Sequence, residues 1–233
     1  MSSDEMKQAA GRAAVDRYLQ SGMYVGLGTG STAIWSIRRI GELLRAGTLT
    51  GILGVPTSFQ SMMAGEEEGI PLRSLNDPEI DGKLDIVFDG ADEVDEHRHL
   101  TKGGGGALLR EKILATAAKQ LIIVIDEGKR VTHLSTRHPI PVEVIPDGRR
   151  FVTHELERLG AQIEIRMAER KMGPVVTDNG NILLDIRFEP GMDAPGMEAA
   201  IKGIPGVVEN GLFTRLNPTV LVGREDGTLE TVG

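Results

Sequence analysis

The 233-residue sequence has no cysteine, which excludes disulfides, thiolate metal ligands and cysteine nucleophiles together. Aromatic residues make up only 3% of it, so few rings are available to stack on bases or to anchor in a membrane interface. No run reaches about 18 apolar residues, and the charged segment from Met1 to Arg17 lacks the pattern of a signal peptide. With a net charge of −8 and no basic block, neither nucleic acid nor a membrane is an expected partner. A cytoplasmic protein is expected.

Glycine, by contrast, occurs 30 times, and three glycines alternate in the stretch Gly26-Leu27-Gly28-Thr29-Gly30-Ser31-Thr32. A short apolar run precedes this stretch and a helical apolar pattern follows it, which predicts a strand, a tight loop and the start of a helix. Glycines let backbone amides approach a ligand, and a helix N-terminus adds unpaired donors. The stretch therefore predicts an anion site, most naturally for phosphate, with contacts from Thr29, Gly30, Ser31 and Thr32.

The spacing of these glycines does not fit the two commonest nucleotide-binding loops. A dinucleotide fingerprint requires G-x-G-x-x-G and an acidic residue after the next strand, and neither is present. A nucleoside-triphosphate loop requires a lysine directly after its last glycine, and Ser31 stands there instead. A single phosphate remains as the predicted ligand. The alternative is a plain glycine-rich turn in which Ser31 or Thr32 caps the helix.

Strands and helices alternate over the first part of the chain. Ser2 and Glu5 have capping-box spacing and open a helix that is expected to end near Gly22. After the first strand, further strands are predicted at 51–55, 72–75, 84–88 and 121–125, with helices between most of them. This order predicts an α/β fold with a doubly wound, mostly parallel, Rossmann-like sheet, whose ligands bind beyond the carboxyl ends of the strands.

The pattern changes after residue 130, where prolines interrupt the chain and no further glycine-rich ligand loop occurs. Residues 131–206 are predicted to form a smaller, inserted α+β domain of the ferredoxin-like type. Residues 1–130 and 207–233 are predicted to form the Rossmann-like catalytic domain. The two apolar runs of the tail, Val207-Val208 and Thr219-Val220-Leu221-Val222, are expected to rejoin the first sheet.

An acidic loop, Asp89-Gly90-Ala91-Asp92-Glu93-Val94-Asp95, directly follows the predicted strand 84–88. Asp89 and Asp92 are suited to accept hydrogen bonds from sugar hydroxyls or to move protons between oxygens. A metal site that adds His97 and His99 matches no recognised ligand spacing, so no metal is predicted. A solvated turn remains the alternative for this loop.

A second glycine-rich stretch, Lys102-Gly103-Gly104-Gly105-Gly106, opens another predicted helix. Its amides can form a donor nest, and Lys102 adds a movable positive charge. Glu111 lies about one turn inside this helix, and because helical side chains lean toward the N-terminus, its carboxylate can reach back toward the loop as a base. A purely structural glutamate in a first helical turn is the alternative.

Two further lysines are candidate ligand contacts, and Lys129 is a second candidate phosphate cation. Lys129 follows the predicted strand 121–125 at its carboxyl end, and Lys7 lies on the first helix. Ordinary solvated lysines are the alternative for both.

These loops together suit a small phosphorylated hydroxy-carbonyl compound. Aldose–ketose isomerisation requires a carboxylate that lifts a proton beside a carbonyl, and donors that hold the resulting enediolate. A grip on a remote phosphate contributes binding energy that positions the reacting carbons. No cofactor site accompanies the loops.

Four ordered motifs also resemble the type A ribose-5-phosphate isomerases over essentially the whole chain. They are residues 26–32, 89–93, 102–112 and 141–146. The resemblance implies interconversion of ribose 5-phosphate and ribulose 5-phosphate in the pentose phosphate pathway. It also implies a homo-oligomer, either a dimer or a tetramer, that needs neither cofactor nor metal.

The same resemblance implies roles for individual residues. Glu111 matches the general base, Asp89 and Asp92 match the acidic pair for ring opening and hydroxyl proton transfer, and Lys102 matches the cation beside the enediolate oxygens. Further substrate contacts are implied for Lys7, Thr29, Gly30, Ser31, Thr32, Gly90, Ala91, Gly103, Gly104, Gly105 and Lys129.

Two rival functions remain at this point. A non-catalytic sugar-phosphate sensor would share the fold, although such sensors usually carry an added DNA-binding module. An amino-sugar-phosphate deaminase or an acyl-CoA transferase would share the sheet but not the joint set of Asp89, Asp92, Lys102 and Glu111.

Overall fold

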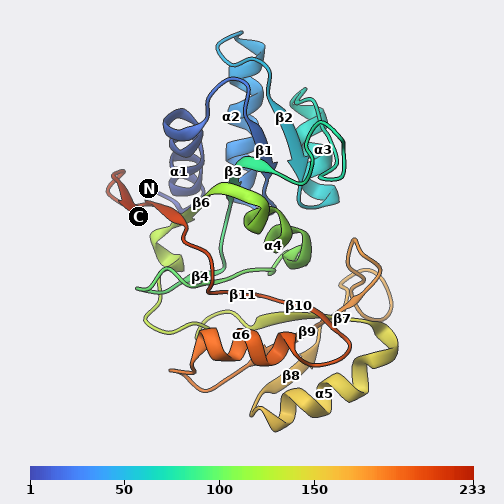
Figure 1. Ribbon diagram of the computed structural model, residues 1–233. Helices are drawn as coiled ribbons and strands as arrows, with labels where there is room; N and C mark the ends of the chain where they lie inside the picture. Colours follow the sequence, from blue (N-terminus) through green and yellow to red (C-terminus); the bar gives the residue numbers. More distant parts are fainter. The chain divides into compact units, whose positions relative to one another are not determined.

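The computed structural model of the chain describes residues 1–233, which divide into two units (Figure 1). Unit 1 comprises Met1–Ala91, Arg110–Lys129 and Leu216–Gly233. Unit 2 comprises Asp92–Leu109 and Arg130–Arg215. Each unit has its own sheet and its own hydrophobic core.

Unit 1 is built on a six-stranded sheet with the strand order β13-β12-β6-β3-β1-β2. All neighbouring strands are parallel except β12 and β13. The chain leaves β1 toward β2 on one side and later fills the other side from β3, so loops after β1 and β3 flank the switch point where ligands of such sheets bind. The strands are β1 (Tyr24–Leu27), β2 (Leu53–Pro56), β3 (Leu84–Asp89), β6 (Ala118–Asp126), β12 (Thr219–Gly223) and β13 (Leu229–Val232).

Four helices belong wholly or mainly to unit 1. They are α1 (Ser3–Tyr18), α2 (Ala33–Arg45), α3 (Phe59–Glu67) and α4 (Leu108–Ala117), with a short 3₁₀ turn at η1 (Glu127–Lys129). The capping box of α1 is formed as predicted, since the side chain of Ser2 accepts from the amide of Glu5 and that of Glu5 accepts from Ser2. The helix packs on α2, β6 and β12 and ends at Tyr18, four residues before the expected Gly22.

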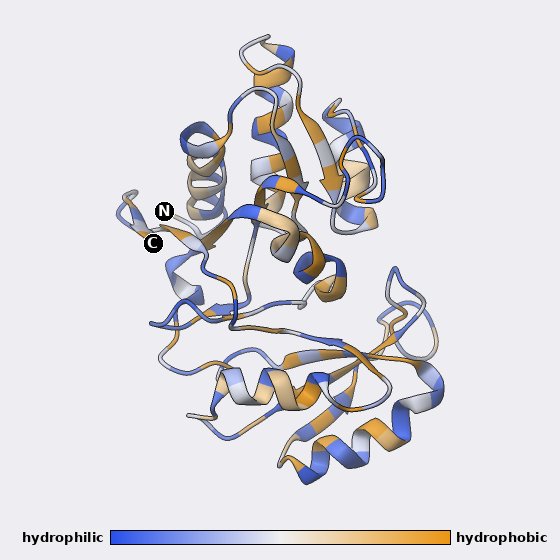
Figure 2. Ribbon diagram, viewed as in Figure 1, coloured by the Kyte–Doolittle hydropathy of each residue, from blue (hydrophilic) through white to orange (hydrophobic).

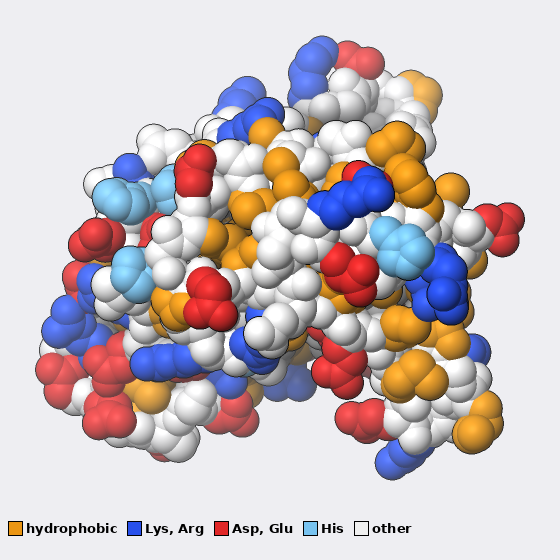
Figure 3. Space-filling model, turned by 90° about the horizontal axis from the view of Figure 1, so that it is seen from below, with side chains coloured by type: hydrophobic (Ala, Val, Ile, Leu, Met, Phe, Trp, Pro, Cys, Tyr) orange, Lys and Arg blue, Asp and Glu red, His pale blue; other side chains and the backbone are white.

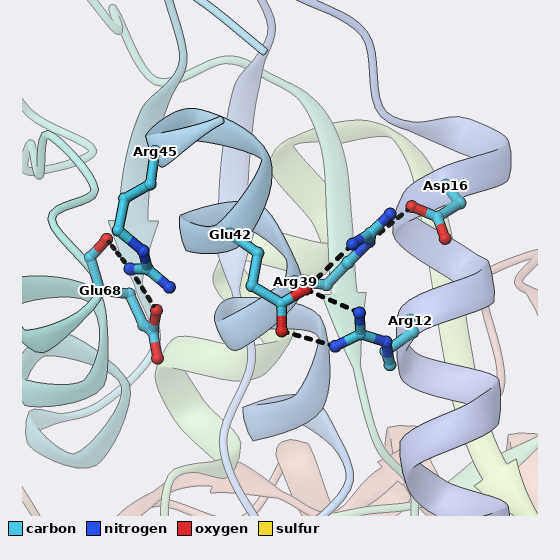
Figure 4. A network of polar contacts seen from close by, with 6 residues as sticks. All are labelled: Arg12, Asp16, Arg39, Glu42, Arg45 and Glu68. Atoms are coloured by element: carbon cyan, nitrogen blue, oxygen red, sulfur yellow. Dashed lines mark hydrogen bonds and ion pairs between the residues drawn. The ribbon is translucent and has the colours of Figure 1, made fainter. Parts of the chain in front are cut away.

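An ion-pair network joins α1 and α2 (Figure 4). The guanidinium of Arg12 donates to both oxygens of Glu42 at 2.6 and 2.7 Å, and Arg39 donates to the same carboxylate at 2.9 Å. Arg39 also donates to Asp16 at 2.7 Å. Hydrogen bonds from Arg12 and then Arg39 favour the charged form, and they lower the pKa of Glu42 from 4.5 to about 2.

Unit 2 contains a four-stranded antiparallel sheet in the order β10-β7-β9-β8. With its two helices the chain runs β-α-β-β-α-β, which is the ferredoxin-like arrangement. The elements are β7 (Ile140–Val144), η2 (Pro146–Gly148), α5 (Arg149–Arg158), β8 (Gln162–Ile165), β9 (Ile182–Arg187), α6 (Ala194–Lys202) and β10 (Val207–Asn210). Hydrophilic and hydrophobic residues alternate along α5 in Figure 2, and Val152 and Leu156 form its buried face.

A small three-stranded sheet completes unit 2. It consists of β4 (Glu93–Val94), β5 (Leu100–Thr101) and β11 (Leu212–Phe213), with β5 in the middle. All three strands lie in unit 2, and Asp92–Leu109 therefore belongs to that unit. The predicted boundaries had placed these residues in the same domain as the glycine loop after β1.

The α/β class and the mostly parallel sheet are confirmed, but two local predictions are wrong. Residues 72–75 form no strand, because only Leu72 makes a bridge, to Gly54, before the chain turns. Val207-Val208 does not rejoin the first sheet, since it lies in β10 and pairs with β7. None of the helices combines the length and apolar character that crossing a membrane requires.

Candidate active site

The first glycine loop leaves β1 directly beside the end of β3. The amide of Gly28 donates to the carbonyl of Phe88 at 2.9 Å. A Cβ atom at Gly28 would lie only 2.4 Å from both that carbonyl oxygen and Oδ1 of Asp89. Glycine is therefore required here, because any side chain would displace the Asp89 carboxylate.

Asp89 is 1% exposed, and its carboxylate is anchored to two backbone amides. Its Oδ1 atom accepts from Gly90 at 2.8 Å and from Thr29 at 3.1 Å. These charge-assisted hydrogen bonds fix the carboxylate against the glycine loop. The predicted residues Thr29, Asp89 and Gly90 are thus brought together in unit 1.

The hydroxyl of Thr29 is engaged by the loop between β2 and α3. Its Oγ1 atom lies 2.7 Å from Oγ1 of Thr57 and 2.6 Å from Oγ of Ser58. The amide of Gly30 donates to the side-chain oxygen of Gln60 at 2.9 Å. Thr57, Ser58 and Gln60 were not predicted as site residues, although two hydroxyls at a strand-to-helix junction are a signal that could have found them.

Thr32 occupies the N-cap position of α2, but its side chain makes no capping hydrogen bond. The alternative in which the Thr32 side chain simply caps the helix is therefore wrong. Thr32 is 9% exposed and Ser31 is exposed. A Cβ atom at Gly90 would meet Cβ of Thr32 at 3.6 Å, so the acidic loop also borders the start of α2.

Glu111 lies in the first turn of α4, as predicted, and is 4% exposed. The preceding residue, Arg110, places its guanidinium 5.6 Å from the ring centroid of Phe59, the first residue of α3. The helix then leads into β6, which is the neighbour of β3. The helix that carries this buried carboxylate in its first turn therefore leads to β6, the neighbour of the strand that ends at Asp89.

Lys129 and Lys7 are both partly buried in unit 1. Lys129 ends the 3₁₀ turn that follows β6. The first turn of α1 lies at the same strand ends, because Ser3 donates to Asp126 at 3.2 Å and a Cβ atom at Gly223 would lie 2.4 Å from the carbonyl oxygen of Met6. Both lysines therefore lie at the carboxyl edge of the sheet, where parallel sheets bind ligands.

In unit 2 the hairpin of β4 and β5 brings Asp92 and Lys102 to one end. Glu93 pairs with Thr101 across the hairpin, so the residue before Glu93 and the residue after Thr101 emerge side by side. The amide of Asp92 donates to the carbonyl of Thr101 at 2.8 Å. Lys102 is 3% exposed, and its ammonium lies 5.6 Å from the ring centroid of Phe213.

The second glycine loop closes onto Asp92. The amide of Gly104 donates to Oδ2 of Asp92 at 2.8 Å, and a Cβ atom at Gly104 would come within 2.6 Å of Oδ1. Gly103 has φ +95°, a conformation that favours glycine. Unit 2 therefore gathers Asp92, Lys102 and the loop of Gly103, Gly104 and Gly105.

Glu93, which was noted only as part of the acidic loop, anchors this hairpin. Its side chain is fully buried and accepts from the amides of Ser135, Arg137 and His138 at 2.6, 2.5 and 2.9 Å. Carboxylates that accept several backbone amides are held firmly. Glu93 thus ties the hairpin that carries Asp92 to the segment before β7.

The histidines beside the acidic loop serve its conformation. Nδ1 of His99 lies 3.1 Å from Oδ2 of Asp95, while Oδ1 of Asp95 accepts from the amides of His97 and His99. No group of three or more histidine, aspartate or glutamate side chains has an arrangement that could hold a metal ion.

The sequence matches a family model described as ribose 5-phosphate isomerase A (phosphoriboisomerase A) over residues 53–227. The ribose-5-phosphate isomerase A of Thermosynechococcus vestitus is 51% identical over 219 residues, which cover 94% of this chain and 91% of that protein. The protein of the same name from Treponema denticola is 41% identical over 237 residues, which cover 99% of each chain.

Solved structures of ribose-5-phosphate isomerases are also similar to this chain. Ribose 5-phosphate isomerase A from Methanocaldococcus jannaschii has a TM-score of 0.92 at 43% identity, with 99% of both chains covered. A D-ribose-5-phosphate isomerase in complex with phospho-erythronic acid has a TM-score of 0.95 at 40% identity, with 100% of this chain and 99% of that chain covered.

The fold, the strand-end loops and these relatives define the chain as an aldose–ketose isomerase. It belongs to the ribose 5-phosphate isomerase A family. The predicted family, fold class and enzyme class are confirmed.

Proposed function

We propose that this chain interconverts ribose 5-phosphate and ribulose 5-phosphate through an enediolate, with Glu111 as the base that carries the proton between C1 and C2. The observation that carries the proposal is the burial of Glu111, 4% exposed, in the first turn of a helix that a glycine loop opens. A carboxylate in that place can abstract a proton only if a substrate reaches it in an orientation that the loops impose.

The other site residues have complementary proposed roles. Asp89 and Asp92 handle ring opening and proton transfer between the hydroxyls, since each has a carboxylate that is held in place by at least one backbone amide. Lys102 and the amide of Gly105 stabilise the enediolate oxygens, and Gly103 and Gly104 line the same part of the site. The sugar and its phosphate are contacted by Lys7, Thr29, Gly30, Ser31, Thr32, Gly90, Ala91 and Lys129.

The phospho-erythronic acid complex of the solved relative supports this division of labour. That ligand carries a phosphate and a carboxylate, and the two oxygens of a carboxylate resemble those of an enediolate in charge and planarity. A protein that binds it must offer donors to two separate anions. In this chain the proposed donors are Lys102 with the second glycine loop for one anion, and Lys129 with Ser31 and Thr32 at the end of the first glycine loop for the other.

The reaction moves one proton between C1 and C2 and one between their oxygens, and it leaves the net oxidation state of the sugar unchanged, so it needs no redox cofactor; we propose that it uses no metal. We also propose a cytoplasmic homo-oligomer, a dimer or a tetramer, with no nucleic acid or membrane partner. The charge distribution supports the absence of a nucleic acid partner. The net charge is −8, and lysine and arginine side chains are interspersed with acidic ones on the face in Figure 3.

Proton NMR of ribose 5-phosphate with purified protein in EDTA tests this function. Ribulose 5-phosphate is expected to appear, and ribose without its phosphate is expected to react with a kcat/KM lower by roughly 10³, because the phosphate grip is lost. Failure to convert ribose 5-phosphate would overturn the proposal.

A further inference from the structure

Arg166 is a partly buried arginine of unit 2 that directly follows β8. Its guanidinium grips Asp185 on the neighbouring strand β9, with Nε 2.8 Å from Oδ2 and Nη2 2.5 Å from Oδ1. Both side chains are less than a fifth exposed, at 16% and 18%. This bidentate ion pair fixes the plane of the guanidinium, and Nη1 remains available for hydrogen bonds to other groups.

Nη1 reaches into the second glycine loop. It donates to the carbonyl oxygens of Gly103 and Gly104, both at 3.0 Å. One charged group therefore holds two consecutive carbonyls in a run of four glycines, 103–106, which have no side chains.

Holding the carbonyls also aims the amides. The chain has no cis peptide, and in a trans peptide the C=O and the following N–H point in opposite directions. The carbonyls of Gly103 and Gly104 point at Arg166, so the N–H groups of Gly104 and Gly105 point away from it. The first of these donates to Asp92 at 2.8 Å, and the second belongs to an exposed residue.

We propose that Arg166, fixed by Asp185, is a positioning residue that orients the peptide groups of the second glycine loop for catalysis. Through Gly104 it sets the position of the Asp92 carboxylate, and through Gly105 it presents an amide donor to the enediolate oxygen. This inference rests on the proposed roles of Asp92 and the glycine loop. It gives the ferredoxin-like part of unit 2 a direct part in the reaction.

Preorganised donors stabilise charge that develops in the transition state, so their loss lowers kcat more than it raises KM. Arg166→Met removes the guanidinium and keeps a long side chain. It is expected to lower kcat by roughly 10² while KM for ribose 5-phosphate stays within a few-fold. Arg166→Lys retains the charge but cannot serve Asp185 and two carbonyls at once, so it is expected to restore only part of kcat.

Three further variants separate positioning from folding. Arg187→Met removes an exposed arginine two residues beyond Asp185 on the same strand and is expected to leave both constants unchanged. Asp185→Asn keeps Arg166 but loosens it, and is expected to lower kcat in the same direction. The double variant Arg166→Met/Asp185→Asn should be no slower than Arg166→Met, because Asp185 acts through Arg166.

The readings are kcat, KM, the dissociation constant of phospho-erythronic acid and the thermal midpoint of each variant. Weaker binding of this acid by roughly tenfold in Arg166→Met, with a thermal midpoint that permits folding at the assay temperature, is expected. A kcat of Arg166→Met equal to that of Arg187→Met would overturn the proposal. If Arg166→Met does not fold, unchanged kcat values of both Arg166→Lys and Asp185→Asn would overturn it. An inactive wild type would instead refute the proposed function, so the two failures are distinguishable.

Discussion

Oδ1 of Asp89 accepts a hydrogen bond from the amide of Thr29 across 60 positions of sequence, at 3.1 Å. Because β1 and β3 are parallel neighbours, this contact joins the glycine loop to the acidic loop at the carboxyl ends of both strands. The position of the carboxylate therefore depends on the shape of the glycine loop, and a change in either loop is expected to affect the other.

Gly28→Ala tests this dependence. The added methyl would lie 2.4 Å from the Phe88 carbonyl and from Asp89, so the variant is expected to lose about 1–3 kcal/mol of stability and much of its kcat. Gly203→Ala is the matched control, because its nearest contacts would be ordinary ones at 3.4 and 3.5 Å. Equal thermal midpoints and equal kcat values for the two variants would refute the dependence.

The sequence was sufficient for features that local patterns determine. Glycines at 26, 28 and 30 after an apolar run predicted the loop at β1, and Glu111 was correctly placed in a first helical turn. Features that depend on long-range pairing were missed. Val207-Val208 is an apolar run that suits either sheet, and only its pairing with β7 decides between them. The grip of Arg166 on Gly103 likewise joins positions 63 apart, which no local pattern reveals.

Glu93→Gln is expected to destabilise the protein by about 1–3 kcal/mol, since a side-chain amide group would face backbone N–H groups that the carboxylate now accepts. Glu96→Gln, at a side chain 75% exposed in the same hairpin, is the control and is expected to be neutral. Urea denaturation of both variants and the wild type measures the difference. Identical midpoints for all three would show that Glu93 is not an anchor.

Lys129→Ala is expected to raise KM for ribose 5-phosphate by roughly tenfold with little change in kcat, since a phosphate contact is made alike in the ground state and the transition state. Lys119→Ala is the control, because that lysine is 76% exposed and pairs with Asp85 at the other end of β6. Steady-state kinetics decide the matter. A loss confined to kcat would remove Lys129 from the phosphate site.

The Glu42 network is expected to make stability depend on acid pH. The pKa of Glu42 is lowered in the folded state. Its contribution to folding stability is therefore complete above pH 4.5 and is lost as the pH falls toward about 2. The stability difference between the wild type and Glu42→Gln should therefore narrow over that window. It should also shrink in high salt, because the Glu42 side chain is 38% exposed. Urea denaturation across the window measures it, and a constant difference would contradict the account.

The most direct test of the central claim follows solvent deuterium into the sugar while ribose 5-phosphate is converted in D₂O. With the wild type, deuterium is expected to enter the carbon that receives the proton from Glu111. Glu111→Gln is expected to lower kcat by roughly 10² or more and to keep KM within a few-fold, because the amide can bind but cannot accept the proton. Its deuterium incorporation should fall in parallel. Turnover and incorporation by Glu111→Gln at the wild-type rate would contradict the assignment of Glu111 as the base.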